Sequence, residues 1–190
     1  MNIKEGIEKR FSVRAFTSEV PEMDKIKEIL RLAGSAPSGG NIQPWKVYVL
    51  NEESKTKLAE KTLHNFDNGV QEEIEYEIYP KPLADEYKKR RYECGADMYN
   101  ALSIEKDDLD SRFKQIRENY NFFGAPLGMI ITIDRSFGNN GWGHVGMFLE
   151  NLWLSAIHHG LGLCLQESWS IYPKTVKEAT NHPDNEIVWC

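Results

Sequence analysis

Residues 36–45 read Ala-Pro-Ser-Gly-Gly-Asn-Ile-Gln-Pro-Trp, and they join a helix-like segment to a strand-like one. The two adjacent glycines can adopt backbone conformations that other residues resist, and they let a ligand come close to the main chain. Ser38, Asn41 and Gln43 add polar side chains to the same segment. The composition predicts a loop that binds a small polar or phosphorylated molecule, and an ordinary Pro/Gly turn is the alternative.

Polar residues also alternate near the beginning of the chain, where an Arg-Phe-Ser-Val-Arg-Ala-Phe run contains Arg10, Ser12 and Arg14. In an extended chain these three side chains point to one face, while Phe11 and Val13 point to the other. Two guanidiniums and a hydroxyl on one face suit a phosphate monoester. A solvent-exposed strand with surface charges is the alternative interpretation.

The two runs together resemble the nitroreductase family of FMN-dependent oxidoreductases. Members carry Arg-x-Ser-x-Arg/Lys-x-Phe near the N-terminus and an Ala-Pro-Ser-x-x-Asn-x-Gln-Pro-Trp loop further on, and both motifs stand here almost intact. The similarity continues over residues 119–126 and from Trp142 to the last residue, whereas residues 51–105 match loosely. The resemblance implies a single α+β domain over residues 1–190. Its mixed, mainly antiparallel sheet would be flanked by helices, with a variable excursion at about 67–105.

The resemblance also implies where FMN would be held. Residues 10–14 would hold its phosphate and its pyrimidine and ribityl region, residues 37–41 would come from the partner subunit, and backbone donors at 167–168 would lie near flavin N5. The implied cofactor-binding residues are Arg10, Phe11, Ser12, Arg14, Pro37, Ser38, Gly39, Asn41, Asn119, Glu167 and Ser168. A helix-end role for Asn119 and a plain strand-to-loop transition at 167–168 are the alternatives. No side chain is needed as a nucleophile or general base, because the flavin carries the redox chemistry.

By the same resemblance, the chain would be a homodimer with both FMN sites at its interface. It would transfer hydride from NADH or NADPH through flavin N5 to nitroaromatic, quinone or similar electron-poor compounds, with ping-pong kinetics. Two alternatives stay open: a family branch that performs dehalogenation or enone reduction, and a flavin-binding fragment without turnover. The sequence has neither a Gly-x-Gly-x-x-Gly nor a P-loop motif, which argues against a Rossmann or P-loop nucleotide site.

Composition excludes several other classes of protein. The formal net charge is −6, and the basic run Lys88–Arg91 has acidic neighbours, so nucleic-acid binding is not expected. Cys94, Cys164 and Cys190 are too scattered for a disulfide framework or a zinc site, and no other metal-ligand spacing occurs. A charged N-terminus without an apolar core and the absence of a long apolar stretch predict no signal peptide and no membrane span. Cytoplasm is therefore the expected location.

Apolar periodicity and breaker residues outline the elements. Helices are predicted over residues 2–10, 21–33, 52–66, 83–102, 107–120 and 142–159 and from Pro173 onward, and strands over 45–50, 127–133, 162–166 and 186–190. A loop or mobile excursion is predicted over 67–82, and a Gly/Asn turn over 138–141. Gly160 is expected just past the end of the longest apolar helix.

Three further expectations concern the site. The family continues beyond the strand predicted at 186–190 with a Gly-rich turn, a basic phosphate contact and a tail strand that crosses to the partner. We therefore interpret the chain as truncated and as lacking that exchanged strand. His144 stands where similar subfamilies often have Asp, so it either alters the electrostatics near the flavin or is simply tolerated. Trp142, Phe122 and Phe123 are candidates for lining a substrate pocket.

Overall fold

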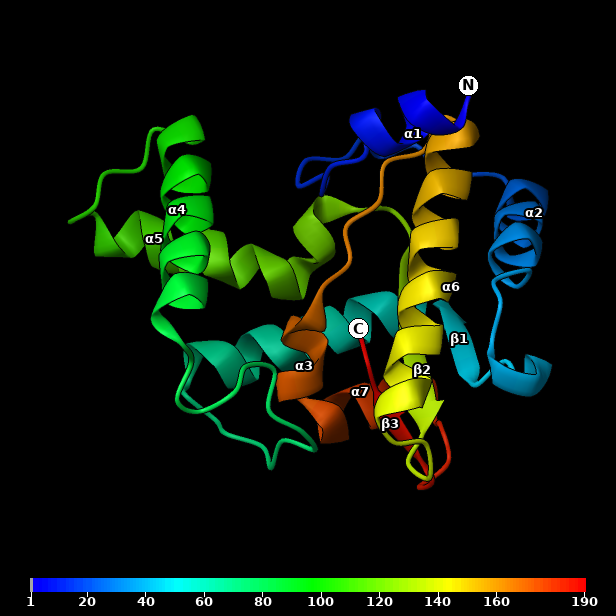
Figure 1. Ribbon diagram of the computed structural model, residues 1–190. Coiled ribbons are helices and arrows are strands. Elements are labelled where there is room, and N and C mark those ends of the chain that lie inside the picture. Colours follow the sequence, from blue (N-terminus) through cyan, green and yellow to red (C-terminus); the bar gives the residue numbers. More distant parts are fainter. Residues whose placement is uncertain (1) are drawn as a thin grey trace.

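An antiparallel sheet with the order β1-β2-β3 forms the centre of the fold. The computed structural model describes residues 2–190, and Figure 1 shows the helices that surround the sheet. The strands are β1 (Trp45–Leu50), β2 (Gly128–Asp134) and β3 (Glu186–Val188). The α-helices are α1 (Ile3–Lys9), α2 (Met23–Ala33), α3 (Glu52–Asp67), α4 (Asp85–Ala101), α5 (Leu109–Arg117), α6 (Asn139–His158) and α7 (Pro173–Thr180). Short 3-10 helices lie at η1 (Gly39–Asn41), η2 (Glu118–Gly124) and η3 (Glu167–Ile171). The protein has the α+β class that the sequence predicts.

Strand β2 lies in the middle of the sheet and packs on both faces. It pairs with β1 along nearly its whole length and with β3 over its last three residues, Thr132–Asp134. Successive side chains of a strand point to opposite faces. Ile131 and Ile133 accordingly pack with α2 and α6, while Ile130 packs on the other face in the cluster that contains Leu58 of α3.

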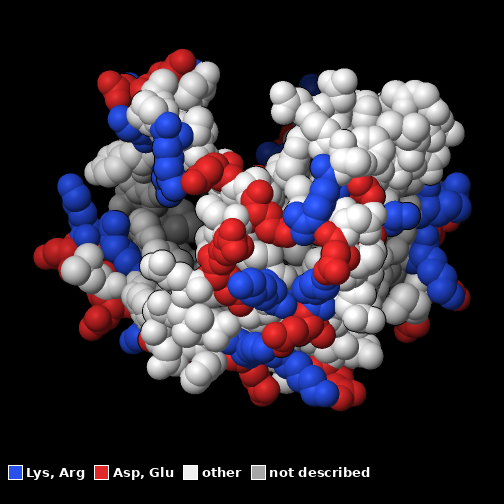
Figure 2. Space-filling view, turned by 90° about the horizontal axis from the view of Figure 1, so that it is seen from below, with Lys and Arg blue, Asp and Glu red and all other residues white. Residues whose placement is uncertain are grey.

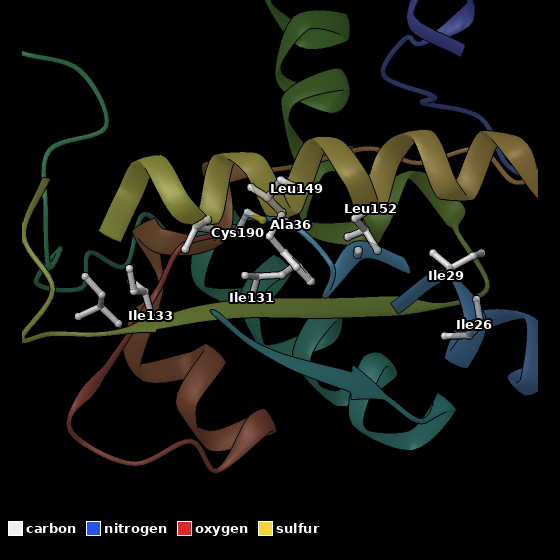
Figure 3. Close-up of a cluster of buried hydrophobic side chains, with 12 residues drawn as sticks. Ile26, Ile29, Ala36, Ile131, Ile133, Leu149, Leu152 and Cys190 are labelled. Carbon is white, nitrogen blue, oxygen red and sulfur yellow. The ribbon is translucent and has the colours of Figure 1, made fainter. Parts of the chain in front are cut away.

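Helix α6 covers one face of the sheet and supplies the largest part of that core. Figure 3 shows Leu149 and Leu152 on the side of α6 that faces Ile131 of β2, with side chains of α2 closing the same cluster. The ring of Phe148, also on α6, stacks on the ring of Trp45 with centroids 5.0 Å apart. Helix α6 also contacts α2, so a broad stripe of its residues from Val145 to Ala156 is buried, whereas Met147 lies outside that stripe and is exposed.

Local signals set several boundaries as predicted. Helix α2 ends at Ala33 and β1 spans Trp45–Leu50, whereas α2 begins at Met23, two residues after the predicted start at Pro21. Gly160 follows the end of α6 with a φ of +75°, a conformation that glycine adopts without strain. Pro173 occupies the first turn of α7, where its missing N–H costs no hydrogen bond.

The strand predicted over residues 162–166 is wrong. The segment belongs to no sheet, and its main-chain contact is a hydrogen bond from the Val13 N–H to the Leu163 carbonyl, 3.1 Å long. Its leucines pack against the α2–α6 core, and that packing does not require a strand partner. A short apolar run can therefore resemble a strand in sequence although only its side chains contact the core and its backbone joins no sheet.

Three other boundaries also differ from the prediction. Helix α6 begins at Asn139 instead of following a turn, because Gly138 is extended and serves as its N-cap. The helix predicted to reach residue 120 ends at Arg117 and continues as the distorted turn η2, in which Phe122 and Phe123 both have φ of +51°. Strand β3 ends at Val188, and the last two residues contact Ile131 outside the regular register.

The excursion has two parts that differ in how they are held. Helices α4 and α5 contain no buried residue and stand away from the sheet (Figure 1). The loop before α4, in contrast, is tied to the body of the protein. Glu75 forms an ion pair with Arg135, and the Tyr76 hydroxyl donates to the Trp189 carbonyl over 3.0 Å. The prediction of a loop is confirmed, and these contacts anchor it.

Glu72 of this loop caps helix α7 from a distance in sequence. Its carboxylate accepts hydrogen bonds from the Lys174 N–H at 2.7 Å and the Thr175 N–H at 3.2 Å, and α7 has no side-chain cap of its own. We expect Glu72→Gln to lower the free energy of unfolding by about 1–2 kcal/mol. The substitution removes the negative charge at the N-terminus of α7 and replaces the carboxylate with a weaker hydrogen-bond acceptor. Urea unfolding measures this change. Glu73→Gln, on the exposed neighbouring residue, is the matched control, and equal losses in both variants would contradict the capping role.

Candidate functional site

Arg10 and Arg14 each lie against an aromatic ring from a distant part of the chain. The Arg10 guanidinium carbon is 4.4 Å from the ring centroid of Trp153 on α6, and that of Arg14 is 5.8 Å from the Phe123 ring on η2. Among residues 2–190, neither guanidinium has a carboxylate within ion-pairing distance. Their positive charges are therefore available to an anionic ligand.

Val13, between the two arginines, fixes this segment against the core. Its side chain packs on Gly162 so closely that a Cβ there would lie 2.8 Å from Val13 Cγ2. Together with the hydrogen bond to Leu163, this contact turns Val13 inward, whereas Phe11 is 65% exposed. Arg14 also acts on Cys164: burial raises the pKa of that thiol, and the arginine charge opposes the shift.

Asn119 is engaged within the chain. Its side-chain N–H donates to the Ile116 carbonyl at 2.8 Å, and Gln166 Nε2 donates to the Asn119 main-chain oxygen at 2.7 Å. The structure thus shows the helix-end role that the sequence left as an alternative. The bond to Gln166 also brings η2 beside Glu167 and Ser168, which begin the 3-10 turn η3 instead of ending a strand.

The Ser168 hydroxyl lacks a partner. Its Oγ is buried and makes no hydrogen bond within residues 2–190. Buried hydroxyls nearly always have a partner, so this atom is suited to a ligand that supplies one. Two free guanidiniums and this hydroxyl fit a phosphorylated ligand with a polar side, which is the chemistry of FMN.

The loop at residues 36–45 lies near the beginning of α6, whereas Arg10 lies near its end. Gly39 N–H donates to His144 Nε2 at 3.3 Å. His144 precedes Trp153, the residue against which Arg10 stacks, by nine positions, which is roughly 13 Å along a helix axis. Among the hydrogen bonds described for residues 2–190, none joins the 37–43 loop to residues 10–14. The structure therefore divides the predicted residues between two groups. The first group comprises Arg10, Phe11, Ser12 and Arg14, in the segment that reaches Trp153 and Phe123, together with Asn119, Glu167 and Ser168 of η2 and η3, which the Asn119–Gln166 bond connects. The second group, in the loop bonded to His144, comprises Pro37, Ser38, Gly39 and Asn41.

A cavity of about 470 Å³ lies beside the first group. It is enclosed by the segment that follows Arg14, by the beginning of β2 and by residues 160–166, and its walls are mostly apolar. Phe122 lines it, as expected for a pocket residue, but Phe123 and Trp142 do not. Trp142 packs instead between Tyr76 and Trp189, with ring centroids 4.8 and 4.6 Å away.

Charges of both signs are mixed on the face seen from below. Figure 2 shows lysine and arginine side chains interspersed with aspartate and glutamate over that face. Within residues 2–190, no helix is long and apolar enough to cross a membrane. In the same residues no group of three or more His, Cys, Asp or Glu side chains could hold a metal ion.

A family model described as the nitroreductase family matches residues 7–190. The chain belongs to the nitroreductase family. Nitrobenzene nitroreductase of Ectopseudomonas oleovorans is 30% identical over 188 residues, which are 98% of this chain and 82% of that protein. A 4-nitrobenzoate reductase of Nocardioides sp. (strain LMS-CY) is 32% identical over 184 residues, covering 95% of this chain and 74% of the relative.

Solved structures agree with this membership. The crystal structure of the FMN- and NADPH-dependent nitroreductase NfnB from Sphigopyxis sp. strain HMH superposes with a TM-score of 0.94 at 33% sequence identity. The superposition covers 100% of this chain and 85% of that one. The antiparallel sheet and the helices around it are therefore the nitroreductase fold.

Sequence reasoning missed part of this nitroreductase site. Nothing in the sequence indicates that Trp153, which is buried on α6, also supports Arg10. Gln166 was treated as the end of a strand, although its amide joins η2 to the segment before η3. Both contacts join residues far apart in the chain. The closest local signal was polarity at the end of an apolar run, which marks Gln166 but not its partner.

Burial of Glu167 predicts a pH-dependent contribution to stability. Burial raises the pKa of its carboxyl above the ordinary 4.5, so the folded chain binds this proton more tightly than the unfolded chain. As the pH rises above 4.5, the unfolded state ionises first, and the contribution of Glu167 to the free energy of unfolding falls. We expect Glu167→Gln to gain stability relative to wild type with rising pH and to level off above the folded pKa. Urea unfolding of both proteins over a pH series measures the difference, and a difference independent of pH would contradict it.

Proposed function

We propose that this protein is an FMN-dependent oxidoreductase that takes hydride from NADH or NADPH and reduces nitroaromatic, quinone or similar electron-poor compounds. The observation that carries the proposal is the pair of guanidiniums, Arg10 and Arg14, which lie on aromatic rings and have no carboxylate partner among residues 2–190. The buried Ser168 hydroxyl, which has no partner in the same residues, is a further group that a polar ligand could satisfy. Membership of the nitroreductase family, with relatives named for nitrobenzene and 4-nitrobenzoate, supports the substrate class.

In this proposal the residues of the chain bind and orient the cofactor. Arg10, Ser12 and Arg14 would hold the phosphate and the neighbouring polar region of FMN. The Ser168 hydroxyl would form a hydrogen bond with the buried part of the ligand. When bound, FMN would supply the redox chemistry by accepting and releasing hydride at N5. A backbone N–H at residues 167–168 near that atom would stabilise the negative charge of the reduced ring. Release of the nicotinamide before the oxidant binds gives the expected ping-pong kinetics.

A homodimer would complete the site. The loop group around Gly39 and the group around Arg10 are separated along α6 within one chain, so a second copy could bring its own loop to the Arg10 group. Asn41 and Pro37 would then contact FMN across the interface, as the resemblance implies. A C₂ arrangement would create two such sites, which links assembly to activity.

Visible absorption spectroscopy tests the proposal directly. The purified chain is mixed with FMN, desalted and then treated with NADPH or NADH without air. A retained flavin band that bleaches, and that returns on adding nitrobenzene, is the expected result. A retained band that resists both nucleotides would favour a flavin-binding protein without turnover, and a band lost on desalting would contradict tight FMN binding. Light scattering of the loaded protein checks the dimer.

A further inference from the structure

The 37–43 loop depends on one side chain from outside its own sequence neighbourhood. Its other hydrogen bonds are local, including Gln43 N–H to Ser38 Oγ at 3.0 Å and Asn41 N–H to the Ser38 carbonyl at 2.9 Å. These bonds shape the turn but do not attach it to the protein. Among the hydrogen bonds described for residues 2–190, the one that joins this loop to another element runs from Gly39 N–H to His144 Nε2.

The backbone of the 37–43 loop has several positive φ angles, and its conformation therefore needs support from outside the loop. Gly40, Asn41 and Gln43 have φ of +59°, +56° and +47°; glycine and asparagine tolerate this conformation, whereas glutamine rarely adopts it. A turn with this strain is retained only where the surroundings support it. The His144 ring provides that support at close range, since a Cβ on Gly39 would lie 3.3 Å from Nε2 and 3.6 Å from Cε1.

The orientation of the His144 ring serves this contact. For Nε2 to accept from Gly39, the ring proton must reside on Nδ1. Nδ1 is buried and has no hydrogen-bond partner within residues 2–190. The histidine thus leaves one nitrogen unsatisfied while it satisfies Gly39, and its hydrogen bonding within the chain is directed to the loop.

We propose that His144 is a positioning residue that holds Gly39, and through it the 37–43 loop, in the conformation that binds FMN. This inference rests on the proposed function for its link to FMN, while the attachment of the loop stands on the geometry alone. His144 therefore has a structural role at this position and is more than a tolerated substitution. The role acts through the Gly39 main chain and involves no step of the reaction.

Two substitutions separate the acceptor from the bulk of the ring. His144→Leu introduces an apolar side chain of similar size and removes the hydrogen-bond acceptor. In His144→Gln, the side-chain amide oxygen can accept the hydrogen bond from the Gly39 N–H in place of Nε2. His159→Leu, on the same helix and bonded to Ser155 instead of the loop, is the matched control. Thermal unfolding of all three variants shows which of them are folded.

Hydrogen–deuterium exchange of the FMN-free chain is the first readout. The Gly39 amide is expected to exchange several-fold faster in His144→Leu and at the wild-type rate in His144→Gln and His159→Leu. Equal exchange in wild type and His144→Leu would overturn the inference whether or not FMN binds. This result is independent of the proposed function, because no cofactor is present.

FMN affinity is the second readout. His144→Leu is expected to raise the FMN Kd by about 3- to 10-fold, as the loss of one neutral hydrogen bond implies, and His144→Gln is expected to restore it. Faster exchange with an unchanged Kd would overturn the link between His144 and the cofactor. If wild type itself fails to bind FMN, the proposed function is wrong, and the exchange data still decide whether His144 holds the loop.

Discussion

Replacing Arg14 by Ala is expected to raise the Kd for FMN by about 10- to 100-fold, because a hydrogen bond to a charged phosphate contributes about 1.5–3 kcal/mol. The guanidinium lies over Phe123 and has no carboxylate partner among residues 2–190, so its charge is not already neutralised. Arg14→Lys keeps the charge but loses the planar two-pronged donor, and should fall between Ala and wild type. Titration of the chain with FMN, followed by flavin fluorescence, gives the three constants.

A charge-matched control distinguishes the site from general electrostatics. Arg31 lies on α2, is exposed and is paired with Glu28 at 2.7 Å. Arg31→Ala removes the same formal charge without touching the 10–14 segment, and its FMN Kd should stay within about twofold of wild type because exposed charges are screened. Equal weakening in Arg14→Ala and Arg31→Ala would contradict the placement of the phosphate at Arg14.

Replacing Phe148 by Ala is expected to lower the free energy of unfolding by about 3–5 kcal/mol, because it leaves a cavity in the core between α6 and the sheet. Phe148 is 2% exposed, and its ring stacks on Trp45 of β1, so the change separates α6 from the sheet. A chain of this size should lose about 2–4 °C in Tm for each kcal/mol. Urea unfolding at a fixed protein concentration measures the loss, since dimerisation would make stability depend on concentration.

Met147 is the natural comparison for Phe148. It is the preceding residue of α6 but is 38% exposed and points away from the sheet core. Met147→Ala should change the free energy of unfolding much less, by about 0.5 kcal/mol. Similar losses in the two variants would show that Phe148 does not occupy a well-packed core.

The resemblance carried by two short motifs was sufficient to predict the family, because the residues that identify it are contiguous. The groups that hold a phosphate and the glycines that form a tight loop must each occupy fixed spacings, so both motifs can be read without a structure. How these residues are supported could not be read in the same way. Arg10 on Trp153 and Gln166 on Asn119 join segments whose spacing in sequence carries no signal.

The secondary structure was likewise predictable where its signals are local and not where it depends on distant residues. Strand β1 and the end of helix α2 were predicted to the residue, and the start of α2 to within two residues, since apolar periodicity and a following glycine or loop are local properties. Residues 162–166 were predicted as a strand because their apolar run satisfies the same rule, yet a strand also needs a paired edge beside it. The structure places that segment against the core, where its leucines are partly buried although its backbone pairs with no strand.

The sequence by itself determined the family, the α+β class and the main helices, and it predicted which residues would hold a phosphorylated cofactor. Only the tertiary structure decided which distant residues come together: it places Arg10 on Trp153, bonds the Gly39 loop to His144 and caps α7 with Glu72. The physical reason is the range of the interactions. Propensities, caps and motif spacings act within a few residues, whereas packing and long-range hydrogen bonds depend on the whole chain having already folded.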